Sequence, residues 1–151
     1  MQTQNNNHTT QLEFLRGDVF QAKSFGADGL AVFYGGLSAI RILAEEHQAD
    51  AEFPQSFRCI RYVDLNRERQ IGCVDDMERL LVEVLDQFAA SGCRVVAMNG
   101  LRCDERPDPH VRSEKYQIQF IEKWLGSHPG VFDKICLIDL RDGFHLADTL
   151  I

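Results

Sequence analysis

Residues 29–36 read GLAVFYGG, and this short stretch indicates the fold class of the chain. The six residues from Gly29 to Tyr34 are all uncharged, and their number suits a β-strand that is covered on both faces. Gly35 and Gly36 end the strand, and apolar residues then recur at spacings of three and four from residue 37 to residue 47. That spacing is typical of an amphipathic helix. The stretch therefore predicts a central strand that turns directly into a helix.

The same alternation of strand and helix continues in both directions along the chain. Four further apolar runs have the length of a strand, at residues 12–15, 57–63, 93–98 and 134–140. Helical patterns separate the last three of them, at residues 74–88 and 113–125. Right-handed crossovers between such strands place helices on both faces of a sheet. We therefore predict an α/β fold, a three-layer sandwich with a mixed, mostly parallel central sheet.

Polar residues and glycines mark the expected helix ends. Asp75, with Glu78 three residues later, has the pattern of a capping box at the start of the first long helix, and Gly92 would close it. Ser113 is the expected N-cap of the next helix, and Gly126 is its expected end.

Length and composition indicate one globular domain. The chain has 151 residues, of which 44% are hydrophobic and 26% are charged, and this is enough for one hydrophobic core. The first ten residues are rich in Gln, Asn and Thr and offer little to bury. We predict a disordered leader over residues 1–10 and a single domain over residues 11–151.

Charge, hydropathy and cysteine usage exclude several classes of partner. The net charge is −7 and the sixteen Lys and Arg residues are scattered, so bulk nucleic-acid binding is disfavoured. No apolar run approaches the roughly 18 residues that a membrane span needs, and the N-terminal residues lack the apolar core of a secretion signal. Five cysteines without a CxxC pair suit reduced thiols in a cytoplasmic protein rather than disulfides or a zinc site. We expect neither metal nor cofactor. The cysteines are Cys59, Cys73, Cys93, Cys103 and Cys136.

The loops after two predicted strands are the expected place for a ligand. In an α/β sheet, ligands bind beyond the carboxyl ends of the strands. Gly35 and Gly36 follow one strand and Gly100 follows another, so the backbone there would admit a phosphate close to a helix N-terminus. The alternative for Gly35 and Gly36 is a plain tight turn, because no complete phosphate-binding motif is present.

Two short motifs carry a resemblance to a known family. Residues 16–20 (RGDVF) resemble the turn that follows the first long strand of the macro domain, and residues 27–32 (ADGLAV) are similar to its second core strand. The macro domain family contains ADP-ribose-binding modules and ADP-ribose hydrolases. The resemblance extends over residues 12–140, which is nearly all of the predicted domain.

The resemblance implies roles for particular residues. Asp18 and Val19 would contact the adenine edge, the loop at Gly35 and Gly36 would face the diphosphate and the distal ribose, and residues 100–105 would form a second phosphate-facing loop. In that second loop, Arg102 would help to hold a diphosphate. Asp18 is equally well explained as a turn residue. Tyr34, at the end of its strand, is expected either to stack on a base or ribose or to lie at the rim of the core.

The chain also departs from the family pattern at the end of the second core strand. Where the family's hydrolases carry asparagines, this chain has Val32, Phe33, Tyr34 and Gly35. We therefore predict binding of an adenine nucleotide or an ADP-ribose-like ligand without a dedicated catalytic set. Two alternatives stay open. One is an interaction or structural module, such as a homodimer, in which these bulky residues fill the pocket; the other is a hydrolase that uses the charged loop at residues 99–109.

Overall fold

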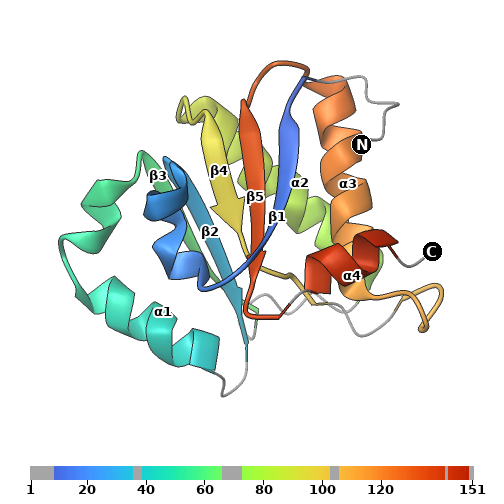
Figure 1. The fold of residues 1–151 in the computed structure, drawn as a ribbon, viewed down its shortest axis with the longest axis horizontal. Coiled ribbons are helices and arrows are strands. Elements are labelled where there is room, and N and C mark those ends of the chain that lie inside the picture. Colours follow the sequence, from blue (N-terminus) through green and yellow to red (C-terminus); the bar gives the residue numbers. More distant parts are fainter. Residues whose placement is uncertain (1–8, 36–38, 66–72, 103–105, 142, 150–151) are drawn as a thin grey trace.

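The computed structural model describes residues 9–149 except for four short segments, 36–38, 66–72, 103–105 and 142. Within this part, five strands alternate with four α-helices and two 3-10 helices (Figure 1). The strands are β1 (Gln11–Arg16), β2 (Gly29–Tyr34), β3 (Cys59–Asp64), β4 (Val95–Met98) and β5 (Lys134–Asp139). The helices are η1 (Val19–Phe25), α1 (Ala39–Ala49), η2 (Phe53–Ser56), α2 (Val74–Ala90), α3 (Ser113–Ser127) and α4 (Gly143–Thr149).

The five strands form one sheet in the order β1-β5-β4-β2-β3. Every pair of neighbouring strands that the structure describes is parallel. The predicted α/β fold with a mostly parallel sheet is confirmed, and the described part of the sheet has no antiparallel member. All five strands therefore end at the same edge of the sheet, and this edge is where the candidate site lies.

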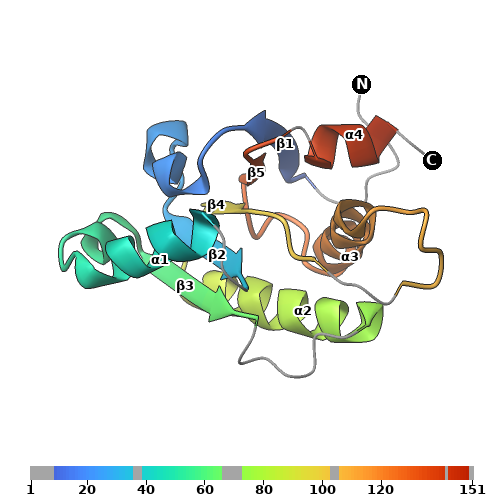
Figure 2. The ribbon, with the colours of Figure 1, turned by 90° about the horizontal axis from the view of Figure 1, so that it is seen from below.

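Helices cover both faces of the sheet, as expected for three layers (Figure 2). Side chains of β2 alternate between two hydrophobic clusters, because successive residues of a strand point to opposite faces. Phe33 belongs to the cluster beneath α2, α3 and α4. Val32 and Tyr34 belong to the cluster beneath η1 and α1. All six residues of β2 are buried, which confirms the prediction of a central strand.

Helix α2 lies very close to the start of β2. A Cβ atom placed on Gly29 would lie 2.9 Å from Val96 Cγ1 and 3.1 Å from Phe88 Cδ1, distances that real side chains do not tolerate without rearrangement. Phe88 is completely buried in this contact. The glycine is thus needed for the close packing of helix on sheet rather than for an unusual backbone angle.

Three predicted helix ends were wrong, each by one or two residues. Helix α2 begins at Val74 after Cys73, so Asp75 already has a helical conformation and cannot act as the N-cap. Ser113 is the first residue of α3 rather than its cap, and the helix continues through Gly126 to Ser127. Gly92, in contrast, follows the C-cap Ser91 of α2 with a φ of +77° and closes the helix as predicted. Local sequence patterns locate helix ends only to within such margins.

The structure also bears on the N-terminal segment and on the cysteines. Thr10 is buried and its hydroxyl donates a hydrogen bond to the carbonyl oxygen of Phe132 at 2.7 Å, directly before the predicted domain boundary.

The four described cysteines form no disulfide, whereas Cys103 lies outside the described residues. Burial raises the pKa of the Cys93 thiol to about 12 and that of Cys136 to about 11, so both stay protonated at neutral pH. No described helix has the length and hydropathy needed to cross a membrane.

Candidate ligand-binding site

A cavity of about 810 Å³ opens at the carboxyl ends of the strands. Each of the five strands contributes the segment that follows it, so the cavity lies where the topology of an α/β sheet leads one to expect a ligand. The first turns of α3 and α4 complete the wall. In the order of the strands in the sequence, the lining residues that follow them are Gly17 and Val19, Gly35, Leu65, Gly100 to Arg102, and Leu140 with Arg141.

Most of the residues predicted from the sequence for this site line the cavity. These are Val19, Tyr34, Gly35, Gly100 and Arg102. Asp18 lies between two lining residues but is not itself part of the lining. Gly36 and the loop residues Cys103, Asp104 and Glu105 lie outside the described residues.

The Asp18 side chain has a local structural role. Asp18 is the N-cap of η1, and its carboxylate accepts a hydrogen bond from the Phe20 N–H at 2.9 Å. The same interaction is what an Asp in a turn commonly makes. The cap holds Val19, the next residue, in the wall of the cavity.

Replacing Asp18 with alanine should therefore lower the free energy of unfolding by about 1 kcal/mol, because one backbone N–H of η1 loses its acceptor. The measurement is denaturation in urea, with Asp18→Asn as the control, since asparagine keeps the acceptor oxygen and should cost only a few tenths of that amount. Equal losses for both variants would show that the cap contributes nothing.

The aromatic residues at the end of β2 do not fill the cavity. Phe33 is 2% exposed and packs in the core on the α2 side of the sheet, whereas Tyr34 packs on the opposite side. The Tyr34 hydroxyl accepts a hydrogen bond from Gln48 at 3.1 Å, and the Arg41 guanidinium lies 5.1 Å from the centre of its ring. Both rings form wall and core, and the space between the glycine-bearing loops stays open. This arrangement counts against a module whose pocket is plugged.

Two buried amide side chains hold the loop after β4. Asn99 accepts a hydrogen bond from the Phe33 N–H at 2.8 Å and donates one to the Phe33 carbonyl oxygen at 2.9 Å. Gln117, on α3, is completely buried; it donates to the Asn99 carbonyl oxygen at 3.0 Å and accepts from the Leu101 N–H at 2.8 Å. The two amides thus fix the loop after β4 relative to the end of β2 and to α3.

Neither amide was singled out from the sequence. The available signal was the position of Gln117 on the inward face of α3, four residues before the buried Ile121. A polar side chain at such a position must find hydrogen-bond partners inside the protein. Which backbone groups those partners are depends on tertiary structure and could not be predicted from the sequence.

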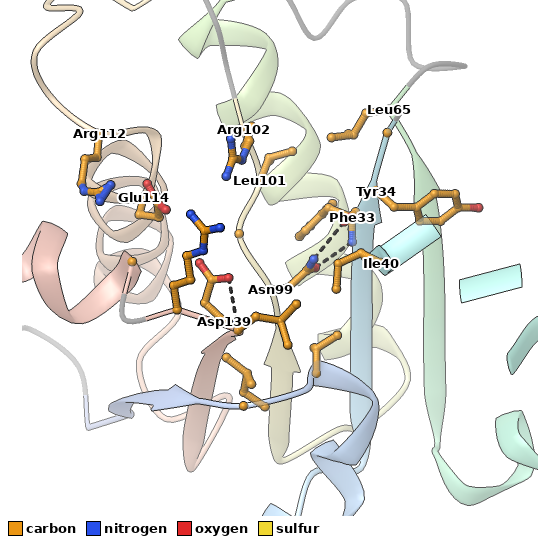
Figure 3. Close-up of a pocket in the computed structure, with 18 of the residues that line it drawn as sticks. Phe33, Tyr34, Ile40, Leu65, Asn99, Leu101, Arg102, Arg112, Glu114 and Asp139 are labelled. Atoms are coloured by element: carbon orange, nitrogen blue, oxygen red, sulfur yellow. Dashed lines mark hydrogen bonds between the residues drawn. The ribbon is translucent and has the colours of Figure 1, made fainter. Parts of the chain in front are cut away.

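Charged residues gather at one side of the cavity and apolar residues at the other (Figure 3). Arg102, Arg112 and Arg141 line the charged side, and all three are exposed. None of them forms an ion pair with another residue in the part of the chain that the structure describes. Guanidinium groups in this state are suited to an anionic ligand.

Two carboxylates, those of Asp139 and Glu114, share this side of the cavity. Burial raises the pKa of Asp139, and the nearby Glu114 charge acts in the same direction. Backbone N–H groups and Arg102 oppose the shift. The site therefore presents donors for an anion next to acceptors for hydroxyl or amino groups.

The charged loop after β4 offers less support for the hydrolase alternative. The Arg106 guanidinium donates hydrogen bonds to the Val111 and Pro109 carbonyl oxygens at 2.7 and 2.9 Å, and it contacts the Ser113 hydroxyl at 3.4 Å. Arg106 thus stabilises its own loop through these hydrogen bonds, and it does not line the cavity. Asp104 and Glu105, two acidic residues of this loop, lie outside the described residues.

Comparison with known proteins gives a clear result only at the level of structure. No protein-family model matches the sequence, and no curated protein matches it at a significant level. Among solved structures, in contrast, macrodomains superimpose on nearly the whole chain. The fold is thus that of a macrodomain, and the predicted resemblance is confirmed at this level.

Three of the matching structures are crystal structures of the Trypanosoma brucei macrodomain. The first, crystal form 1, has a TM-score of 0.68 at 10% identity and covers 95% of this chain and 68% of its own. The complex with ADP has a TM-score of 0.67 at 10% identity and covers 91% and 67%. The complex with ADP-ribose has a TM-score of 0.66 at 11% identity and covers 95% and 69%.

Proposed function

We propose that this chain is a macro-like module that binds an adenine nucleotide or an ADP-ribose-like ligand in the cavity and carries out no reaction on it. The observation that carries the proposal is the cavity itself, which opens at the strand ends of a macrodomain fold and is lined by three arginines without ion-pair partners among the described residues. Macrodomain structures of the same fold hold ADP and ADP-ribose.

In this proposal the ligand lies across the loops. Asp18 and Val19 take the adenine edge, and Tyr34 with Gly35 faces the far end of the ligand. The diphosphate lies at Gly100 and Arg102, where the loop is held by the two buried amides. The end of β2 supports binding without catalysis, because Val32 and Phe33 are apolar and the Tyr34 hydroxyl is already hydrogen-bonded to Gln48.

We also infer that residues 11–151 fold as one unit and that the protein is cytoplasmic. The pairing of β1 with β5 and the packing of α4 in the same cluster as α2 support the first inference. The unpaired thiols of the described cysteines support the second.

A titration of the purified chain with ADP-ribose, ADP, AMP and ATP tests the binding proposal. We expect at least one of them to bind in calorimetry, and a ligand at one hundred times its Kd should stabilise the fold by about 2.7 kcal/mol. The absence of both heat and thermal shift with all four would contradict the proposed function.

Replacing Arg102 with alanine should lower the affinity for the ligand by roughly tenfold to a hundredfold. The reason is that a hydrogen bond from a charged donor to a phosphate is worth about 1.5–3 kcal/mol. Arg79→Ala is the matched control, since Arg79 is exposed on α2, pairs with Asp76 and does not line the cavity. Equal affinities of the two variants would remove Arg102 from the site.

A further inference from the structure

The last strand brings a carboxylate next to the proposed adenine position. Asp139, the final residue of β5, is the register partner of Arg16 in β1. Its carbonyl oxygen accepts a hydrogen bond from the Gly17 N–H at 2.7 Å. Asp139 therefore lies beside the turn that contains Asp18 and Val19, and its side chain enters the same cavity.

Glu114, near the start of α3, meets Asp139 from the other side. A Cβ atom placed on Gly143 would lie 2.6 Å from Glu114 Oε2 and 2.8 Å from Asp139 Oδ2, so the two carboxylates converge on one point where glycine leaves room for them. The second oxygen of Asp139 accepts a hydrogen bond from the Leu140 N–H at 2.9 Å, which fixes the orientation of the group. Figure 3 shows both side chains at the charged side of the cavity.

The carboxylate pair has a definite preference among the groups of a nucleotide. A carboxylate only accepts hydrogen bonds, so it suits the hydroxyl groups of a sugar and repels a phosphate. In dinucleotide-binding folds, a carboxylate in contact with the ribose 2′-hydroxyl selects the unphosphorylated nucleotide in the same way. Burial raises the pKa of Asp139, and the neighbouring Glu114 charge adds to this shift.

We propose that Asp139 and Glu114 bind the 2′- and 3′-hydroxyls of the ribose that carries the adenine, and that they reject a ligand with a phosphate at either position. This inference rests on the proposed function, because it takes the adenine to lie at Asp18 and Val19. The ribose is bonded directly to the adenine, so it must lie in the part of the cavity next to Asp18 and Val19. On the β5 side, the carboxylate pair lines that part of the cavity.

The arginines near Asp139 and Glu114 should allow the preference for an unphosphorylated ribose to be reversed by substitution of the two carboxylates. Arg102 and Arg141 line the same side of the cavity and have no ion-pair partner among the described residues. In the native protein, the negative charges of the two carboxylates offset the positive charges of Arg102 and Arg141. Once both carboxylates are neutral, the guanidinium groups dominate, and a 2′-phosphate becomes an acceptable ligand.

Calorimetric titrations with ADP-ribose and with ADP-ribose 2′-phosphate test the proposal. The native chain should bind ADP-ribose more tightly by about tenfold or more. In the double variant Asp139→Asn, Glu114→Gln, the ratio of the two affinities should fall to about one or reverse. A thermal unfolding curve of the variant verifies that it is folded.

A second double variant, Glu46→Gln with Asp75→Asn, changes the net charge equally but outside the cavity lining, and it should keep the native ratio. If native protein binds ADP-ribose but does not discriminate, or if the ratio persists in the Asp139 and Glu114 variant, the selector role is wrong while the binding function stands. If the native chain binds neither ligand nor any nucleotide, the proposed function and this inference both fail.

Discussion

Replacing Gln117 with leucine is expected to lower the free energy of unfolding by about 2–4 kcal/mol. The leucine leaves the Asn99 carbonyl and the Leu101 N–H without their partners in a buried loop. Each buried backbone group that loses its hydrogen bond costs about 1–3 kcal/mol. Chemical denaturation monitored by Trp124 fluorescence would measure the loss, because Trp124 lies buried on the same helix.

Gln119→Leu provides a matched control for this change. Gln119 lies on the same helix and is exposed, so the same substitution there should alter stability by no more than about 0.5 kcal/mol. If both leucine variants unfold at the same denaturant concentration, the buried amide does not hold the loop. If the loop is held as described, the Gln117 variant should also bind the nucleotide more weakly.

Truncating Phe88 to alanine should have the largest effect, a loss of about 3–5 kcal/mol of unfolding free energy. Phe88 is completely buried between α2 and the sheet, and its removal leaves a cavity that the rigid strands cannot close. Phe120→Ala, at a partly buried position on α3, should cost clearly less. Urea denaturation of both variants measures the difference.

A double-mutant cycle with Gly29 examines the same contact from the other side. Gly29→Ala alone should destabilise the protein, because the new methyl group would meet Val96 and Phe88. In the Phe88→Ala background, part of that space is free, so the cost of Gly29→Ala should fall. Strictly additive losses would show that a methyl group on Gly29 does not interact with the Phe88 ring.

The fold could be predicted well from the sequence because its signals are local and strong. The apolar run from Gly29 to Tyr34 has the length and composition of a strand covered on two faces, and the long helical pattern of α2 is continuous. The exact ends of the helices were less predictable. Asp75 and Ser113 both favour helix starts, but the packing of neighbouring turns decides which residue leaves the extended conformation.

The site was predictable only in part. Glycines after buried strands pointed to the loops that line the cavity, since strand ends converge in any parallel sheet. Asp139 and Glu114 could not be found in this way, because they are 25 residues apart and meet only through the packing of α3 and α4 at the end of β5. Their proximity depends on tertiary structure alone.

The strand order also constrains how the chain can fold during its synthesis. Among the described strands, β1 pairs only with β5, which lies more than a hundred residues later, so β1 emerges from the ribosome long before this partner exists. Pairings of such long range form slowly, and an unpaired strand edge invites association with other chains. Nascent chains that stall before residue 139 should therefore expose β1 without its partner strand and depend on chaperones.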